Sequence, residues 1–167
     1  MDGVALTEHG NMFSTLPFYQ KAQKAGINPI IGCETYVAVE SRHNKKPQAG
    51  GGWGNNHLIL LVQNQIGYKN LMKLVTAGYL EGFYYRPRID VELLKEHSDG
   101  LVCLSGCLKG EIPEKMLNGD YEGARDAALR FSEIFSDRFY LEVQNHGIPE
   151  EEANIENMKK LAHDLSL

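Results

Sequence analysis

The sequence contains little that would direct a protein out of the cell or into a membrane. It has only three cysteines, Cys33, Cys103 and Cys107, and an odd number does not fit a disulfide framework. Its first residues do not form the charged and then apolar segments of a secretory leader. The longest apolar runs, residues 30–33 and 58–62, are far too short to span a bilayer. We therefore expect a cytoplasmic protein with no membrane partner.

The sequence also lacks an excess of positive charge. Asp and Glu number 22 against 17 Lys and Arg, so the net charge is −5. A protein that holds DNA through its backbone usually presents a basic surface. The charge balance therefore argues against strong nucleic-acid binding by this chain alone, although it is compatible with a local basic strip.

Three common signatures of nucleotide-binding and hydrolytic enzymes are missing. The sequence has no glycine-rich phosphate loop ending in Lys-Ser or Lys-Thr, no Gly-x-Ser-x-Gly elbow and no Cys-x-x-Cys pair. A hydrolase hypothesis for this chain therefore depends on side chains that could bind a metal ion.

Short apolar runs alternate along the chain with amphipathic stretches of helical length. Strands are predicted at residues 4–7, 29–33 (extended through 35–39), 57–62, 101–104 and 139–143. Helices are predicted at residues 18–25, 67–80, 91–96, 112–117, 121–135 and 150–165, and a polar, Gly-rich loop with the only Trp, Trp53, at 40–56. Such alternation predicts an α/β fold with a mostly parallel sheet, and both an open doubly wound sheet and part of a βα barrel fit it.

Side chains that bind metals gather at the ends of these apolar runs. His9 and Glu34 follow the first and second runs, His57 opens the third, and Cys107 and His146 follow the fourth and fifth. In βα architectures the carboxyl ends of the strands form the working face. Imidazole, carboxylate and thiolate groups together suit zinc, manganese or iron rather than calcium.

Each of these residues also has an ordinary structural interpretation when taken alone. A histidine before a glycine can satisfy a turn, a lone glutamate is usually solvated or ion-paired, and a lone cysteine is usually a small buried hydrophobe. Core packing is the better interpretation for Cys33 and Cys103. We expect His43, His97 and His163 to lie on the surface.

The segment at residues 83–88 combines aromatic side chains with arginines. Tyr84, Tyr85, Arg86 and Arg88 could stack on bases and hold phosphates, which would make them nucleic-acid contacts. The alternative is a loop packed against its own domain with exposed arginines, and the acidic total favours that alternative.

Six segments carry most of these residues. They are residues 5–12 (ALTEHGNM), 26–34 (GINPIIGCE), 57–61 with 67–71 (HLILL, GYKNL), 81–90 (EGFYYRPRID), 104–111 (LSGCLKGE) and 140–147 (YLEVQNHG). Singly none is specific, but together they cover essentially the whole chain. With these motifs the sequence resembles the PHP domain of bacterial DNA polymerase III alpha subunits.

The resemblance implies an incomplete, distorted (βα)7 PHP barrel, with divalent metal ions bound at the carboxyl ends of its strands. The ligand positions map onto His9, Glu34, His57, Cys107 and His146, with Glu34 as the bridging carboxylate. The first His-x-His motif and the last Asp-x-His motif of the family have no counterpart here. We therefore expect residues 1–167 to be a single PHP domain fragment, truncated at both ends.

The resemblance also implies a role in bacterial DNA replication. The parent would be a DNA-directed DNA polymerase, a nucleotidyltransferase with Mg²⁺ at its polymerase site, whereas this chain alone would be inactive. Its partners would be the remaining polymerase domains, DNA and other replisome subunits. With its ligands complete, the domain could act as a 3′–5′ exonuclease. The alternatives are a free-standing PHP metal-dependent phosphoesterase and a non-catalytic structural or partner-binding module.

Overall fold

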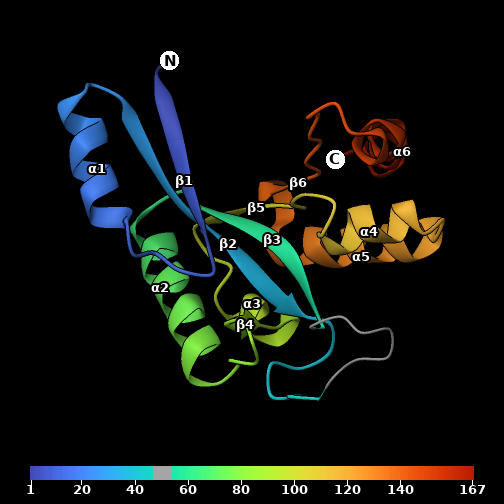
Figure 1. Cartoon of the computed structure of the whole chain (residues 1–167), viewed down its shortest axis with the longest axis horizontal. Helices are drawn as coiled ribbons and strands as arrows, with labels where there is room; N and C mark the ends of the chain where they lie inside the picture. The colour runs from blue at the N-terminus through green and yellow to red at the C-terminus, as the bar shows by residue number, and fades with distance from the viewer. Residues whose placement is uncertain (47–53) are drawn as a thin grey trace.

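The computed structural model describes residues 1–46 and 54–167, which form an α/β fold built on a six-stranded sheet. The elements are β1 (Gly3–His9), α1 (Thr15–Lys24), β2 (Asn28–Ala38), β3 (Asn55–Val62), α2 (Gln65–Leu80), β4 (Arg88–Ile89), α3 (Val91–Glu96), β5 (Leu101–Leu104), α4 (Glu111–Leu117), α5 (Tyr121–Phe135), the 3₁₀ turn η1 (Ser136–Arg138), β6 (Phe139–Tyr140) and α6 (Pro149–Leu165). Helices α1 and α2 lie to one side of the central strands and α4, α5 and α6 to the other (Figure 1). Among the described residues, no helix has the length and apolar character needed to cross a membrane.

The sheet is mostly parallel, as predicted, and one reversed strand, β3, makes it mixed. Its strand order is β1-β2-β3-β5-β6, and β4 also pairs with β2. β1 runs parallel to β2 and β6 parallel to β5, but β3 runs antiparallel to both of its neighbours, β2 and β5. A parallel return needs a crossover, usually a helix. Between β2 and β3 the sequence has only the polar, Gly-rich stretch predicted as a loop. Residues 47–53 of that stretch, including Trp53, lie outside the described residues.

The six predicted helices are present, with small shifts at their ends. α1 begins at Thr15 rather than at residue 18, and the side chain of Thr15 is buried. The predicted amphipathic character of α5 is confirmed, since its five buried residues form one apolar stripe: Ala124, Ala127, Ala128, Phe131 and Phe135. β4 has only two residues, too few for a periodic pattern to reveal.

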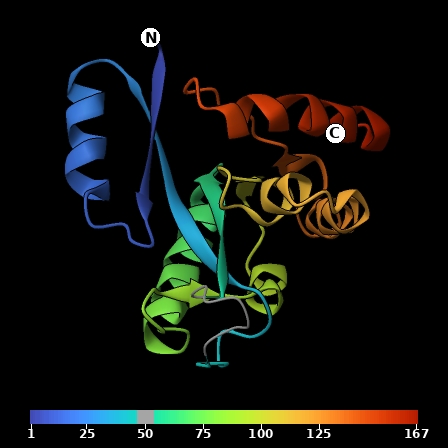
Figure 2. The ribbon, with the colours of Figure 1, turned by 45° about the vertical axis from the view of Figure 1, so that its right-hand side comes forward.

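The hydrophobic core lies between the sheet and the helices that cover it. Its largest fully buried side chains include Leu60 of β3, Leu71 of α2 and Phe131 of α5. Cys33 and Cys103 are also fully buried, which confirms their prediction as core residues. Burial raises the pKa of the Cys33 thiol to about 12, so that group stays a neutral thiol. On the far side, α6 lies over α4 (Figure 2).

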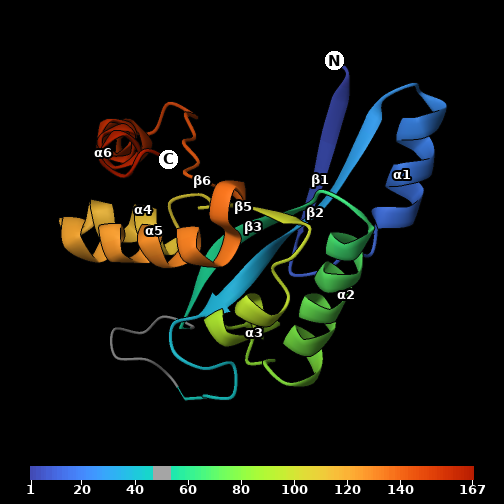
Figure 3. The same cartoon turned by 180° about the vertical axis from the view of Figure 1, so that it is seen from behind.

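A buried ion pair ties the segment after β2 to the start of α3, which lies beside α2 (Figure 3). Asp90 is the N-cap of α3 and accepts a hydrogen bond from Leu93 N at 3.1 Å. Its carboxylate also accepts from Arg42 N at 3.0 Å and from Arg42 Nη1 at 2.9 Å. Burial alone would raise the pKa of Asp90, but the hydrogen bonds from Arg42 and Leu93 and the charge of Arg42 outweigh it and lower that pKa.

We expect Asp90→Ala to lower the free energy of unfolding by about 2–4 kcal/mol, because it removes the N-cap of α3 and leaves Arg42 paired only with the more exposed Glu81. The folded pKa of Asp90 lies below its ordinary 3.8, so this contribution is present above about pH 4 and is lost as the pH falls through the folded pKa. Denaturant unfolding at neutral and acidic pH would measure both effects. Lys95→Ala, an exposed change in the same helix, is the control, and equal losses in the two variants would contradict the prediction.

Candidate metal centre

The registers of three adjacent strands place four side chains on one face of the sheet. His9 of β1 lies opposite Glu34 of β2, and His57 of β3 lies opposite Tyr36 of β2. Residues two apart in a strand point to the same face, so Glu34 and Tyr36 bring their two partners to the same side. Because β3 runs antiparallel, its first residues meet the carboxyl end of β2, and His57 therefore reaches the predicted edge.

Glu34 stands at the centre of this cluster. Nδ1 of His9 and Nδ1 of His57 each donate to Glu34 Oε1 at 2.8 Å. The side chain of His9 is 70% exposed, whereas those of Glu34 and His57 are 12% and 22% exposed. The cluster is therefore open to solvent on the side of β1 and covered on the other side.

Cys107 reaches the cluster through the loop that follows β5. His57 N donates to Lys109 O at 2.9 Å, and Gly110 N donates to Cys107 O at 2.7 Å. These bonds fix the loop against the start of β3. As a result Cys107 Sγ lies 3.6 Å from His57 Nδ1, the same nitrogen that contacts Glu34. Four of the five predicted ligands are thus linked by side-chain contacts.

The electrostatics of the cluster favour a protonated His57. The hydrogen bonds to Cys107 and Glu34 raise the pKa of His57 to about 9 despite the opposing effect of burial. The hydrogen bond from His57 lowers the pKa of Cys107. Burial would raise the pKa of Glu34, but the hydrogen bonds from His57 and His9 outweigh it and lower that pKa. The Glu34 carboxylate and the Cys107 sulfur therefore both lie beside a His57 ring that favours its protonated form.

Gly10 fixes the turn that carries His9. Its φ is +71°, a conformation that L side chains rarely adopt, and Gly10 N donates to Glu34 O at 2.8 Å. A Cβ at this position would lie 2.8 Å from Pro87 Cγ and 2.8 Å from Tyr36 Cε2. Glu8, which precedes His9, does not join the cluster, and its carboxylate accepts from Ser14 N and Ser14 Oγ instead. The chain on both sides of His9 is therefore anchored.

His146 is held elsewhere. Its Nδ1 donates to Glu151 Oε1 at 2.9 Å and its backbone N donates to Glu151 Oε2, so it is tied to the first turn of α6. Within the part of the chain that the structure describes, no hydrogen bond or ion pair joins His146 to the other four predicted ligands. The histidines expected on the surface also stand apart: His43 contacts Glu81, and the side chain of His163 is 91% exposed.

The donor types fit a transition metal, but their present positions do not surround an ion. Two imidazoles, a carboxylate and a thiolate suit zinc, manganese or iron. Across residues 1–46 and 54–167, no group of three or more His, Cys, Asp or Glu side chains is arranged to hold a metal ion. The reason lies in the contacts above, since the donor atoms of His9, Glu34 and His57 point at one another. Metal binding would require these side chains to turn toward a common centre.

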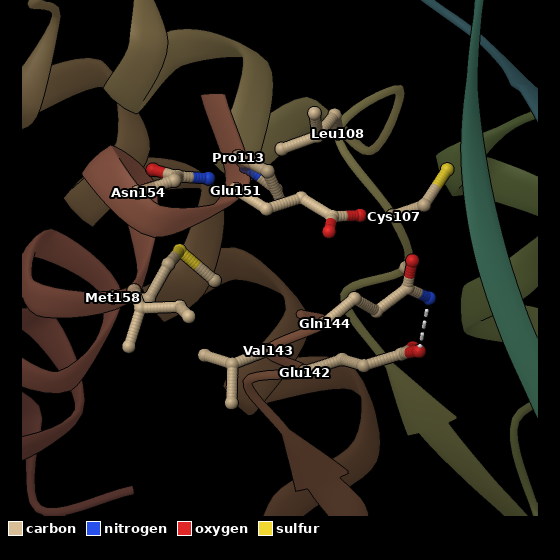
Figure 4. Close-up of a pocket in the computed structure, with 11 residues that line it drawn as sticks. Cys107, Leu108, Pro113, Glu142, Val143, Gln144, Glu151, Asn154 and Met158 are labelled. Atoms are coloured by element: carbon tan, nitrogen blue, oxygen red, sulfur yellow. Dashed lines mark hydrogen bonds between the residues drawn. The ribbon is translucent and has the colours of Figure 1, made fainter. Parts of the chain in front are cut away.

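A small cavity of about 20 Å³ adjoins Cys107 on the side of α6 (Figure 4). Glu142 and Gln144 lie along one wall and Glu151 along another, and Gln144 Nε2 donates to Glu142 Oε1 at 2.7 Å. Among the described residues, the buried Glu142 Oε2 and Asn154 Oδ1 have no hydrogen-bond partner. The cavity has room for about one water molecule. The sequence analysis assigned no role to Glu142, Gln144, Glu151 or Asn154.

The aromatic and arginine segment divides into a buried part and an exposed part. Arg88 is only 2% exposed, and its guanidinium donates to the carbonyls of Gly82, Arg42 and Asn44. It also lies over the Tyr84 ring, 5.1 Å from its centroid. Arg88 therefore holds the loop together and is not free to contact a phosphate. Arg86 is exposed and lies over the ring of Tyr36 at 5.6 Å.

Donors of this kind at one edge of an α/β sheet are typical of metal-centred α/β domains. The chain belongs to the PHP domain family, which it matches over residues 1–146. It is 47% identical over 167 residues to the DNA polymerase III subunit alpha of Borreliella burgdorferi, covering 100% of this chain and 14% of that protein. Identity to the proteins of the same name is 46% over 164 residues in Thermus aquaticus (98% and 13% covered) and 40% over 177 aligned positions in Helicobacter pylori (100% and 14%). The chain thus spans only a small part of these curated relatives.

In protein freed of metal with a chelator, we expect His57 to titrate at about pH 9, because its hydrogen bonds to Cys107 and Glu34 stabilise its imidazolium form. Cys107→Ala and Glu34→Gln each remove one of these partners and should lower the pKa of His57 toward its ordinary 6.5. An NMR titration of the imidazole signals measures the value directly. A pKa of His57 that neither substitution changes would mean that the contacts described here do not exist in solution.

Proposed function

We propose that this chain forms part of the PHP domain of a bacterial DNA polymerase III alpha subunit and acts in DNA replication within that longer protein. The support is the level of identity, 40–47% over 98–100% of the chain, to three proteins of that name. The remaining domains would carry the nucleotidyl transfer with Mg²⁺ and would be the partners of this domain, together with DNA and replisome subunits. This chain alone is expected not to extend a primer.

The barrel of the family is the architecture that we propose for the complete domain. β1 and β6 are the two ends of the strand order, so each can accept a further strand. A closed (βα)7 barrel cut between strands would leave two such edges, because closure is what removes them. We therefore propose that residues 1–167 are a fragment of that barrel.

We further propose that His9, Glu34, His57 and Cys107 form a metal site. The observation that carries this proposal is the convergence of two imidazoles on one carboxylate oxygen, at 2.8 Å each, with a thiol beside one of them. Glu34 is the natural bridging residue because both histidines already contact it. A bound divalent ion would supply a Lewis acid and a water molecule of lowered pKa.

The reaction that such a site would serve is hydrolysis of a terminal phosphodiester, as in 3′–5′ proofreading. Water would add to the phosphorus and the P–O3′ bond would break. The exposed side chain of His9 marks the side from which a strand end can approach, while the half-buried His57 and Cys107 form the floor. His146, tied to Glu151, would have to leave that contact to take part.

A non-catalytic module is the second candidate function. The observation that favours it is that the donor atoms of the cluster satisfy one another by hydrogen bonds, as structural side chains do. A free-standing phosphoesterase is less well supported, because the likeness to DNA polymerase III alpha subunits extends over the whole chain, including residues 81–90.

Metal quantification after dialysis separates these candidates. We expect the protein to retain zinc, manganese or iron, and His9→Ala and Glu34→Ala to lower the bound metal several-fold, because each removes a donor from the centre of the cluster. His97→Ala and His163→Ala are matched controls, since neither side chain contacts the cluster, and they should retain the metal. Extending the polypeptide at both ends should raise the metal content.

Two results would overturn the metal site. One is an extended protein that binds no metal. The other is a loss of metal in His97→Ala equal to that in His9→Ala. A nuclease assay on the extended protein with a single-stranded substrate then decides between the hydrolytic and the non-catalytic candidates.

A further inference from the structure

Three exposed aromatic side chains form a row beside the cluster. Phe13, from the loop between β1 and α1, is 79% exposed, Tyr79 near the end of α2 is 39% exposed, and Phe83 in the following loop is 47% exposed. The ring centroids of Phe13 and Tyr79 lie 6.5 Å apart, and those of Tyr79 and Phe83 lie 6.1 Å apart with nearly parallel planes. We call Phe13, Tyr79 and Phe83 the aromatic row.

The backbone that carries Phe13 and Tyr79 is held in place. Phe13 N donates to Asn11 Oδ1 at 3.0 Å, and the next residue, Ser14, is bonded through both its N and its Oγ to Glu8. Tyr79 belongs to the regular helix α2. Large rings that are held in position lose little conformational entropy on binding a ligand, which distinguishes a binding surface from loose exposed side chains.

The aromatic row leads toward the open side of the cluster. Phe13 follows His9 by four residues, and Gly10 between them lies against Tyr36 and Pro87. Tyr36 in turn makes an edge contact with His57, with ring centroids 5.2 Å apart. A polymer that lies along the row is therefore directed to His9, the exposed donor of the cluster.

Arg86 supplies a positive charge near the row. Arg86 lies over the Tyr36 ring, and within the described residues its guanidinium takes part in no ion pair. The carboxylate of Glu81 is paired with Arg42, whereas that of Glu8 accepts hydrogen bonds from the neutral Ser14 and keeps its charge. Exposed ring faces near an exposed guanidinium without an ion-pair partner suit a ligand that is flat, aromatic and anionic.

We propose that the aromatic row and Arg86 bind single-stranded nucleic acid, with bases stacked on the rings and a phosphate held by Arg86. Aromatic rings stack on any base, so the binding tolerates different sequences. The acidic total charge keeps it weak and sensitive to salt. The direction of the strand toward His9 rests on the proposed function, whereas the stacking itself does not.

The test is fluorescence anisotropy of a labelled single-stranded oligonucleotide at low salt, with chelator present so that the metal plays no part. Stacking contributes about 1–3 kcal/mol per base, so Phe13→Ala and Phe83→Ala should each weaken binding roughly five- to 150-fold. Phe13→Tyr and Phe83→Tyr keep a ring and should bind like the unsubstituted protein, whereas Phe13→Leu keeps apolar area but no ring and should bind like Phe13→Ala. Tyr140→Ala, an aromatic 51% exposed on β6 at the opposite end of the strand order, is the matched control and should bind normally.

Three outcomes would overturn the proposal. The first is equal binding by the Phe13→Ala and unsubstituted proteins, and the second is equal binding of an oligomer of the same length without bases. The third is normal binding by Phe13→Leu, which would indicate an apolar protein-docking surface instead. Circular dichroism of each variant shows that the fold is kept. His9→Ala and Glu34→Ala separate this proposal from the metal site: if they retain the oligonucleotide while no variant binds metal, only the proposed function fails. Metal binding without oligonucleotide binding would overturn this inference but not the proposed function.

Discussion

The pairing of β2 with its neighbours is the constraint on which the site depends. β2 pairs with β1, β3 and β4, and its two long ladders bring His9 and His57 to Glu34 from opposite sides. A slip of one residue in either ladder would turn the donors of the slipped strand to the other face of the sheet. The half-buried carboxylate of Glu34 thus finds its partners only in this register, so strand pairing and the cluster stabilise each other.

The protonated ring of His57 is the second feature that holds the cluster together. Moving the Glu34 carboxylate out of water is costly, and the imidazolium of His57 beside it offsets that cost. The same side chains could bind a metal cation once they lose their protons, as metal ligands must. A cation at this place would replace the proton that His57 shares with its two neighbours.

The segment after α2 contains both buried residues that support the sheet and exposed residues that belong to the surface. Arg88 and Asp90 turn inward and tie the residues after β2 to the start of α3, whereas Phe83 and Arg86 face outward. Pro87 between them packs against Gly10, the residue after His9. This short loop therefore supports the His9 turn and places Phe83, one of the three rings of the aromatic row.

The sequence alone determined the element order, because each helix and long strand has its own apolar period, as the stripe of α5 shows. It also indicated His9, Glu34, His57 and Cys107, since metal-binding side chains at strand ends are visible without coordinates. Only the tertiary structure decided the antiparallel direction of β3, the two-residue strand β4, the separation of His146 from the cluster and the burial of Arg88. These features depend on contacts between residues far apart in the chain, and local periodicity carries no information about which distant side chains will meet.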